Sequence, residues 1–330
     1  MPKVSIITIN YNGIEDTIEC LDSLKKIKYP NYDVFVVDNA SKNNEGERLK
    51  KKFRKYIHLI QSDKNLGFSG GNNLAIREII KENTSKYVLL LNNDTVVDRS
   101  FLEYLVDSAE KNEKIGSIMP QVLQYKNRNV IDSCGIYYYK SGIALILNLN
   151  KEKNKIFKEN LFSSEGVCSL YRAEALKNIS CNNEYFDEDF FMYSEDLDIG
   201  FRLIHKGYIP KFEIKSIIYH KRGTTAGEES DFARYYHSRN VLLTIYKNYP
   251  TYLLFKYFIP IVIMQFGLSI LYTKRWKLGI LMKSYIGFFS MIPLIYKKRI
   301  FILKNSKVKN KNLLKYFEKS IFPIKWILKK

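Results

Sequence analysis

Cysteine is scarce in this 330-residue sequence, and its spacing excludes two kinds of framework. There is no C-x-x-C pair among the four cysteines, Cys20, Cys134, Cys168 and Cys181. A disulfide scaffold or a zinc site needs paired or closely spaced cysteines, so we expect neither, and the scatter fits a reducing compartment. The apolar run near the start of the chain ends at polar Asn10, which is too soon for a signal peptide. We therefore expect the amino-terminal part of the protein to stay in the cytoplasm.

Acidic residues are nearly missing from the end of the chain. After residue 240 there are 18 lysines and arginines and a single acid, Glu318, so this part holds a net +17 of the total of +19. It also contains two runs without a charged residue, 257–273 and 284–296. A basic protein first suggests nucleic-acid binding, but residues 1–240 are nearly balanced in charge and show no recognition motif. Basic charge beside apolar runs favours an anionic membrane surface, and we expect no nucleic-acid partner.

The first 125 residues alternate between two patterns. Apolar runs typical of buried strands occupy 4–10, 32–39, 57–62 and 87–94. Between them, apolar or charged stretches at 14–27, 45–55 and about 72–81 are typical of helices. Strands that are apolar throughout and separated by helices predict an α/β fold with a mostly parallel central sheet, covered by helices on both faces.

Three of these predicted strands end in polar residues. The strand ends are Asn10-Tyr11-Asn12, Asp38-Asn39 and Asn92-Asn93-Asp94. In parallel sheets, ligands bind beyond the carboxyl ends of the strands, so we expect these side chains to share a site. A carboxylate such as Asp94 suits Mg²⁺ or Mn²⁺, which prefer oxygen ligands. A plain turn remains the alternative at this position.

The common glycine-rich phosphate-binding fingerprints are absent. NLGFSGGNN, Asn65–Asn73, has neither G-x-G-x-x-G nor G-K-[ST]. We expect this segment to be a turn before a helix, whose first amides either approach an anion or only connect a strand to a helix.

Acidic and basic residues gather in two later segments. In SEDLDIGFRL, Glu195 and Asp196 begin a helical pattern, where acids stabilise the helix dipole; alternatively, Asp196 is a general base whose proton affinity is raised by its neighbours. His220 ends the strand-like IKSIIYH and is either a structural residue or a metal ligand. RYYHSRN, 234–240, is either a diphosphate-binding segment or a basic helix face that meets lipid headgroups.

Together these segments resemble family 2 glycosyltransferases of the GT-A fold, particularly their rhamnosyltransferase-like branch. The resemblance runs from Val4 to about Asn240. It rests on VSIITINYNG, VVDNAS, NLGFSGGNN, LLLNNDTVV and FDEDFFMYSEDLDIGFRL with HKGY, in the family's order. It implies a GT-A nucleotide-diphospho-sugar transferase domain over residues 1–240. Residues 241–330 then form a basic, apolar, helical and membrane-associating extension.

The resemblance also implies roles for individual residues. Asp38 contacts the nucleoside base, Asp94 occupies the metal-binding position of the D-x-D element, and Asp196 is the catalytic base. The first acid of D-x-D is replaced by Asn92 here, which weakens the expectation that two carboxylates hold the ion. The implied residues are, for catalysis, Asp196 and Glu195; for the nucleotide sugar, Thr8, Asn10, Asp38, Asn65, Gly70, Asn93, Arg234 and Arg239; and for the metal, Asp94 and His220.

The implied reaction is the inverting, Mn²⁺- or Mg²⁺-dependent transfer of a sugar in cell-surface polysaccharide or glycan synthesis. The donor is a nucleoside-diphosphate sugar, and the acceptor is a hydroxyl of a saccharide or a lipid-linked molecule. The place is the cytoplasmic face of the cell membrane. We expect a carboxyl-terminal hairpin that dips into or lies along the membrane interface, with a soluble helical bundle as the alternative. An inactive nucleotide-sugar-binding or scaffold protein, and less plausibly a basic nucleic-acid-binding protein, are the other hypotheses.

Overall fold

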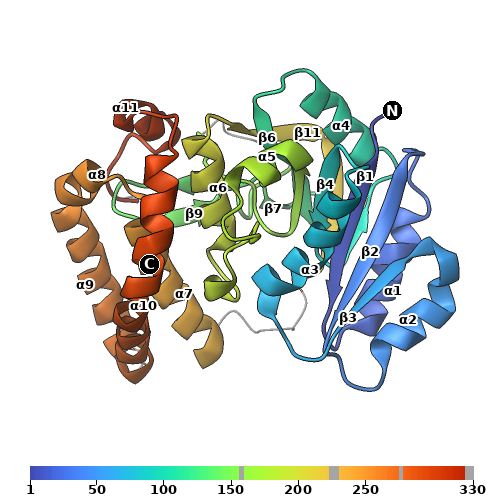
Figure 1. The fold of residues 1–330 in the computed structure, drawn as a ribbon, viewed down its shortest axis with the longest axis horizontal. Helices are drawn as coiled ribbons and strands as arrows, with labels where there is room; N and C mark the ends of the chain where they lie inside the picture. The colour runs from blue at the N-terminus through green and yellow to red at the C-terminus, as the bar shows by residue number, and fades with distance from the viewer. Residues whose placement is uncertain (156–159, 223–229, 275–277, 324–330) are drawn as a thin grey trace.

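The predicted strands form part of a nine-stranded sheet at the centre of the molecule (Figure 1). This computed structural model describes residues 1–155, 160–222, 230–274 and 278–323. The strand order is β3-β2-β1-β4-β10-β6-β11-β5, and β7 pairs with β6. The strands of this sheet are β1 (Val4–Asn10), β2 (Tyr32–Asn39), β3 (His58–Ser62), β4 (Tyr87–Leu91), β5 (Thr95–Val97), β6 (Ile115–Gln124), β7 (Ile131–Ser133), β10 (Cys168–Arg172) and β11 (Ile209–His220); β8 (Ile136–Tyr138) and β9 (Ala144–Ile146) form a separate hairpin.

Helices separate the strands along the chain, as the sequence pattern predicts. Strands β1 to β4 are mutually parallel, β11 is parallel to β6, and β10 is antiparallel to both of its neighbours. The predicted α/β fold with a mostly parallel sheet is therefore confirmed. The helices are α1 (Ile14–Leu24), α2 (Glu45–Phe53), α3 (Gly67–Glu82), α4 (Phe101–Glu110), α5 (Ala173–Ile179), α6 (Glu195–His205), α7 (Asp231–Asn248), α8 (Thr251–Lys256), α9 (Phe258–Lys274), α10 (Leu278–Lys304) and α11 (Asn310–Leu313).

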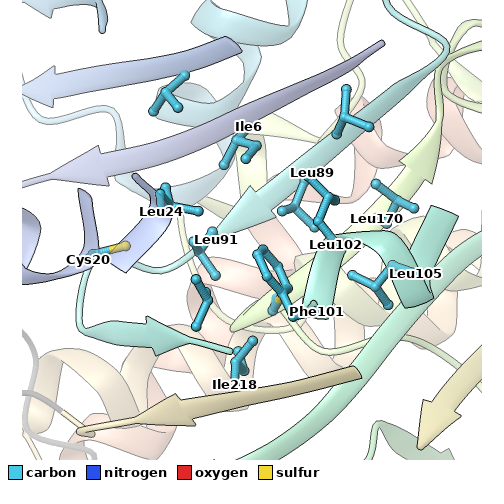
Figure 2. Close-up of a cluster of buried hydrophobic side chains, with 14 of the residues drawn as sticks. Ile6, Cys20, Leu24, Leu89, Leu91, Phe101, Leu102, Leu105, Leu170 and Ile218 are labelled. Carbon is cyan, nitrogen blue, oxygen red and sulfur yellow. The ribbon is translucent and has the colours of Figure 1, made fainter. Parts of the chain in front are cut away.

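Both faces of the parallel strands are buried, which explains their continuous apolar sequences. In β4, Leu89 and Leu91 belong to one apolar cluster, whereas Val88 and Leu90 belong to a cluster on the other face. Figure 2 shows the first cluster, in which Leu89 and Leu91 lie with Phe101 and other residues of α4. Full burial of a leucine contributes about 2 kcal/mol to the free energy of unfolding. Burial of these strands therefore stabilises the sheet whose edge carries the polar strand ends.

Helix α3 begins earlier than the sequence indicates. We expected a turn followed by a helix from about Asn72, but α3 starts at Gly67. Gly67 has a φ of +68°, and a Cβ there would lie 2.3 Å from the carbonyl oxygen of Phe191. Inside the helix, a Cβ on Gly70 would lie 2.8 Å from the Cβ of Leu66. These glycines permit close packing of a helix that ordinary propensity would place later.

The carboxyl-terminal helices share a core with the preceding fold. Helix α7 runs through residue 240, the position at which we divided the chain. The shared core is a cluster of aromatic side chains, packed mostly edge to face, from both sides of that position, namely Tyr138, Phe162, Phe201, Tyr249 and Phe317. The division of the chain into two regions at residue 240 thus stays a prediction. The aromatic core is continuous across this position.

The uncharged run 257–273 and the residues just before it form two helices. Helix α8 ends at Lys256, and α9 begins at Phe258. Pro260 lacks the N–H that would bond to the carbonyl of Lys256, so one continuous helix is disfavoured. Of the helices in the described ranges, α10 alone is long and apolar enough to cross a membrane, whereas the apolar stretch Phe258–Gly267 of α9 is shorter. Residues 275–277, between α9 and α10, lie outside the described residues.

A network of buried charges, which we call the ion network (Asp187, Asp198, Arg202, Lys247 and Lys298), joins α6, α7 and α10. Lys298 Nζ of α10 lies 2.6 Å from Asp187 Oδ1. Lys247 Nζ of α7 also pairs with Asp187, and lies 2.8 Å from Asp198 Oδ1 of α6. Asp198 Oδ2 accepts a hydrogen bond of 2.8 Å from Arg202 Nε. Helix α10 is therefore fastened to the acidic segment by paired charges as well as by apolar packing.

The charges of this network neutralise one another in the protein interior. Burial raises the pKa of Asp187, but the two lysine ammonium groups outweigh burial and hold that pKa well below its usual range. The side chains of Asp187 and Lys247 are 3% and 2% exposed. An isolated carboxylate at such a depth costs several kcal/mol, so each acid here requires its basic partner.

Replacement of Lys298 is expected to destabilise the fold. Lys298→Met keeps the apolar stem but removes one ammonium from Asp187, so we expect a loss of about 3 kcal/mol in the free energy of unfolding. Urea unfolding followed by circular dichroism measures this loss. The matched control is Lys297→Met at the exposed neighbouring position, with an expected change within about 0.5 kcal/mol. Equal losses for the two variants would contradict a specific role for the ion network.

Candidate active site

The ends of β1 and β2 form the first part of the site. Asn10 and Asp38 are register partners, and Asn10 Nδ2 donates to Asp38 Oδ1 at 3.0 Å. The same amide donates to Glu45 Oε2 at 2.9 Å. A Cβ on Gly46 would lie 2.9 Å from Asp38 Oδ2, so only glycine lets α2 come this close to the carboxylate. The predicted pair is thus held in one orientation at the sheet edge.

Thr17 of α1 joins two of the predicted strand ends. Its hydroxyl donates to Asn10 Oδ1 at 2.7 Å and accepts from Asn93 Nδ2 at 2.9 Å. Thr8 is buried two residues before Asn10, and its hydroxyl has no hydrogen-bond partner among the described residues. The structure therefore brings Asn10, Asp38 and Asn93 together, with Thr8 in the strand behind them.

The start of α3 is fastened by side-chain amides. Asn39 Nδ2 donates to Asn65 Oδ1 at 3.1 Å, and Asn65 Oδ1 also accepts from Gly67 N at 2.8 Å. The backbone N–H of Ser69 donates to the carbonyl of Phe191 at 3.1 Å. The backbone N–H groups of Gly67 and Ser69 therefore donate within the protein. This differs from the alternative in which the first N–H groups of this helix approach an anion. Asn65 and Gly70 lie at this helix start, and their contact with a donor sugar stays a prediction.

His220 lies between two aspartates. It is the register partner of Thr95 across β5 and β11, and its Nε2 lies 3.3 Å from Asp94 Oδ2. On the other side of the ring, Nδ1 lies 2.7 Å from Asp132 Oδ2. Asp132 also pairs with Arg222 Nε. The structure thus places the two predicted metal residues side by side.

The surroundings of His220 suit a metal ligand. Burial lowers the pKa of His220, but the hydrogen bonds to Asp132 and Asp94 outweigh burial and raise that pKa to about 9. A ligating histidine commonly donates its second N–H to a carboxylate, which is the position of Asp132. An imidazole nitrogen and a carboxylate oxygen thus face each other, and both are donor types that a divalent cation accepts. Within the described ranges, no group of three or more His, Cys, Asp or Glu side chains is positioned to hold a metal, so such an ion would also need ligands from substrate or water.

Asp196 and Glu195 begin α6 at the same edge of the sheet. Burial raises the pKa of Asp196 to about 6, against the opposing effect of backbone N–H groups of Leu197 and Gly166 that bond to its carboxylate. Burial and the neighbouring Asp196 charge raise the pKa of Glu195 well above its usual value. The raised pKa of Asp196 has the direction that the sequence suggested, but its cause is burial and not the acidic neighbours. A neighbouring acid contributes only to the shift of Glu195. Asp196 remains partly exposed, as a group that exchanges protons with a substrate must be.

Two consecutive residues connect the metal pair to Asp196. The backbone N–H of Gly166 acts on the Asp196 carboxylate and lowers its pKa, and the carbonyl of Val167 accepts from Asn92 N at 2.9 Å. Asn92 lies two residues before Asp94. The segment that enters β10 therefore lies between the two halves of the site and fixes their separation.

The loop before Asp196 has a strained backbone. Phe191, Tyr193 and Ser194 have φ values of +63°, +68° and +67°, a region that costs non-glycine residues of order 1 kcal/mol each. Asn240 of α7 is fully buried and donates through Nδ2 to three carbonyls of this loop, those of Phe190, Met192 and Tyr193, at 2.8–2.9 Å. The strained loop is therefore held by a side chain from the helix that follows the sheet.

Arg239 also serves this loop. Its Nη2 donates to the carbonyl of Asp189 at 2.7 Å, and its guanidinium lies 4.7 Å from the ring centroid of Tyr236. In the structure Arg239 thus contacts the protein itself, and its predicted contact with a diphosphate is untested. Arg234 lies one helical turn earlier on α7 and is partly exposed, so its role also stays a prediction.

Three features of the site were not predicted from the sequence. They are Asp132, Glu45 and the loop contacts of Asn240. Asp132 directly follows the apolar pair Val130-Ile131, and it is 1% exposed. A lone acid in a buried strand needs a partner. This feature of the sequence could have identified Asp132 as part of a site. The contacts of Glu45 and Asn240 depend on packing between distant segments, for which the sequence has no local signal.

Comparison with known proteins identifies the family. A model of glycosyl transferase family 2 matches residues 5–180. The chain is 24% identical over 214 residues to a poly-beta-1,6-N-acetyl-D-glucosamine synthase of Staphylococcus epidermidis, which covers 65% of this chain and 48% of that protein. It is 26% identical over 247 residues to the low-salt glycan biosynthesis hexosyltransferase Agl10 of Haloferax volcanii, covering 74% and 75% of the two chains. This chain spans about half the length of the synthase.

A solved structure shows the same fold. The mannosyltransferase PcManGT from Pyrobaculum calidifontis, in complex with GDP-Man and Mn²⁺, aligns with a TM-score of 0.53 at 14% identity, over 96% of this chain and 86% of that chain. The predicted GT-A fold is thereby confirmed. Because the family model matches more than half of the sequence, this chain belongs to glycosyl transferase family 2.

Proposed function

We propose that the protein is an inverting, metal-dependent glycosyltransferase. It moves a sugar from a nucleoside-diphosphate sugar to a hydroxyl of a saccharide or lipid-linked acceptor in cell-surface polysaccharide or glycan synthesis. The observation that carries this proposal is the Gly166–Val167 segment, which contacts Asp196 on one side and Asn92, beside Asp94, on the other. A base and a metal pair on either side of one short segment suit a reaction in which an acceptor hydroxyl gives its proton to the base and attacks one face of a sugar, while the diphosphate leaves from the opposite face. The glycan-synthesising relatives support the same class of reaction.

Asp94 and His220 are the residues that would hold the divalent cation. Their facing atoms are 3.3 Å apart, and Asp132 orients the imidazole from behind. A bound Mn²⁺ or Mg²⁺ would neutralise negative charge on a departing diphosphate. The Mn²⁺ in PcManGT supports this assignment. Asp38 and Asn10 then lie on the neighbouring strands, where a nucleoside attached to that diphosphate is to be held.

Asp196 is the proposed base of the reaction. With a pKa of about 6, its carboxylate is largely ionised at neutral pH yet basic enough to accept a proton in the transition state. The proton of the acceptor hydroxyl moves to an Asp196 oxygen while the hydroxyl oxygen bonds to the anomeric carbon. The bond from that carbon to the diphosphate oxygen breaks in the same step. One displacement from the opposite face inverts the configuration, and no glycosyl-enzyme intermediate is required.

The carboxyl-terminal helices are proposed to rest on the cytoplasmic face of the membrane. Helices α8 and α9 expose Phe255, Phe258 and Phe266 at 79%, 63% and 67%, and the chain after residue 240 carries a net +17. Exposed aromatic side chains and excess basic charge together suit an anionic lipid surface. Helix α10 has its Lys298 committed to the ion network, which favours a helix that lies along the interface over one that crosses it.

The function is tested by donor binding with and without metal. Among nucleotide sugars offered to the purified protein, we expect one to raise the melting temperature by about 5 °C only when Mn²⁺ is present. Asp94→Ala is expected to abolish that increase. Asp196→Asn is expected to keep it but to lower turnover, measured as nucleoside diphosphate released with lipid-linked acceptors, at least about a hundredfold. Stabilisation that persists in chelator would contradict the metal assignment. Binding without turnover by any acceptor would instead favour an inactive scaffold.

Asn240 is expected to affect the chemical step more than binding. Asn240→Ala leaves three loop carbonyls without their donor, so the strained loop relaxes and Asp196 moves. We expect kcat to fall about tenfold or more while the affinity for the nucleotide sugar changes little. Hydrogen exchange of the amides between Met192 and Leu197 should become faster. The control is Asn305→Ala, at an exposed position. An equal loss of affinity and turnover would place Asn240 in the donor site instead.

Membrane docking is tested by flotation with vesicles. We expect the protein to float with vesicles of phosphatidylglycerol and phosphatidylcholine, and less with phosphatidylcholine alone, because basic residues near an anionic surface contribute about 1 kcal/mol each. The double change Phe255→Glu and Phe266→Glu should abolish flotation, whereas Tyr104→Glu, an exposed aromatic of α4, should not. A protein that remains at the bottom of the gradient with both vesicle types would refute this part of the proposal.

A further inference from the structure

Glu165 lies in the segment that separates the metal pair from the base. It directly precedes Gly166, whose N–H lowers the pKa of Asp196, and Val167, whose carbonyl accepts from Asn92 N. Its own carbonyl accepts a hydrogen bond of 2.7 Å from the hydroxyl of Ser169. The backbone of Glu165 is therefore fixed at the centre of the site, although nothing in the sequence motifs singles this residue out.

The Glu165 side chain is only partly satisfied. The hydroxyl of Ser133 stabilises the charged form of its carboxylate, but Oε2 is buried and has no hydrogen-bond partner among the described residues. Burial raises the pKa of Glu165 to about 7, against the effect of Ser133, and the negative charges of Asp196 and Asp132 add to the increase. The carboxyl group thus lies within electrostatic reach of the base and of the carboxylate behind His220.

Other buried polar atoms near Glu165 also lack partners. In the part of the chain that the structure describes, these include the hydroxyls of Ser164 and Ser194 and Oε2 of Glu195. Each such atom costs about 1–3 kcal/mol when it is left without a partner, so native proteins rarely gather them without a ligand or water. Four buried oxygens without partners, on the segments 164–165 and 194–195, are groups that a molecule rich in hydroxyl groups would satisfy.

The surrounding charges select the kind of group that Glu165 contacts. A phosphate is disfavoured because Glu165, Glu195 and Asp196 are all acidic. A second metal is disfavoured because no group of three metal-ligating side chains is found within the described ranges. A sugar hydroxyl is neutral and both donates and accepts hydrogen bonds, so it satisfies a carboxyl group in either protonation state.

We infer that Glu165 is a specificity-determining residue whose carboxyl group hydrogen-bonds to a hydroxyl of the sugar being transferred. This inference rests on the proposed function, because it places the sugar between the metal pair and Asp196. The anomeric carbon has to lie between the leaving diphosphate and the base, and Glu165 is at that junction. Discrimination among donor sugars then comes partly from this one carboxyl group, since a donor that lacks the matching hydroxyl leaves it unpaired.

The test compares each nucleotide sugar with its own nucleotide. UDP-N-acetylglucosamine, UDP-glucose and GDP-mannose are titrated into the full chain in Mn²⁺ by calorimetry, alongside UDP and GDP. For the donor that the wild-type protein prefers, we expect Glu165→Ala to weaken binding of the nucleotide sugar about tenfold. The affinity for the nucleoside diphosphate should remain within about twofold. Glu165→Gln keeps the shape and a hydrogen-bonding group, so its affinity for the nucleotide sugar should lie between those of the wild type and of Glu165→Ala. This variant also serves as the test if Glu165→Ala does not fold.

The matched control is Glu174→Ala, an exposed carboxylate on α5, which should change neither affinity. If the wild type and the Glu165 variants bind the nucleotide sugar more tightly than the nucleotide by the same factor, the assignment of Glu165 is wrong and the proposed function stands. If Glu165→Gln binds normally but loses all turnover, Glu165 acts in proton transfer and the assignment is also wrong. If the wild type binds no nucleotide or nucleotide sugar in Mn²⁺, the proposed function fails, and the assignment of Glu165 fails with it.

Discussion

The fold depends on the mutual neutralisation of a few buried charges. Asp187 and Asp198 lie almost fully buried next to the segment that carries the base, and Lys247, Lys298 and Arg202 are their partners. Neither acid is tolerable in this interior alone, because an unpaired buried charge costs several kcal/mol. The partners come from α6, α7 and α10. The folded positions of Asp187 and Asp198 therefore require these helices to be packed together. The carboxyl-terminal region is thus part of the structure that supports the site.

The two halves of the site are supported in different ways. Asp94 and His220 follow or end strands, and their separation is set by backbone pairing of β5 with β11. Asp196 follows a loop with three left-handed residues, and this loop keeps its shape through Asn240. Strain of this kind persists only where the surroundings over-determine the backbone. The proposed base is therefore positioned by tertiary contacts, whereas the proposed metal pair is positioned by the sheet.

Helix α10 has two unlike faces, which links the surface of the protein to its site. One face buries Lys298 and Arg299, and Arg299 donates to the carbonyl of Tyr249 just after the end of α7 at 2.6 Å. Another face exposes Met282, Ile286 and Phe289. On the proposed function, the side of the molecule that meets lipid is fastened, through the ion network, to the segment before Asp196. An acceptor held in the membrane would then be presented to a base whose position depends on the same helix.

Much of this protein was readable from local patterns in its sequence. The runs 4–10 and 32–39 became strands with the same bounds, because a buried parallel strand needs apolar residues on both faces. The gathering of Asn10, Asp38 and Asp94 at one sheet edge followed from the direction of parallel strands. The charge imbalance after residue 240 and the family motifs needed no structure either. What these patterns have in common is that their physical cause lies within a few residues of the chain.

Other features were decided only when distant segments met. The early start of α3 depends on the close approach of Phe191 to Gly67, and the partner of Asp187 in α10 is more than a hundred residues away. The position of Glu165 is likewise set by contacts of its neighbours with α6 and with the end of β4. Pairing of this kind is fixed by packing and by the cost of buried, unpaired polar groups. These costs exist only in the folded interior, so no local pattern in the sequence announces them.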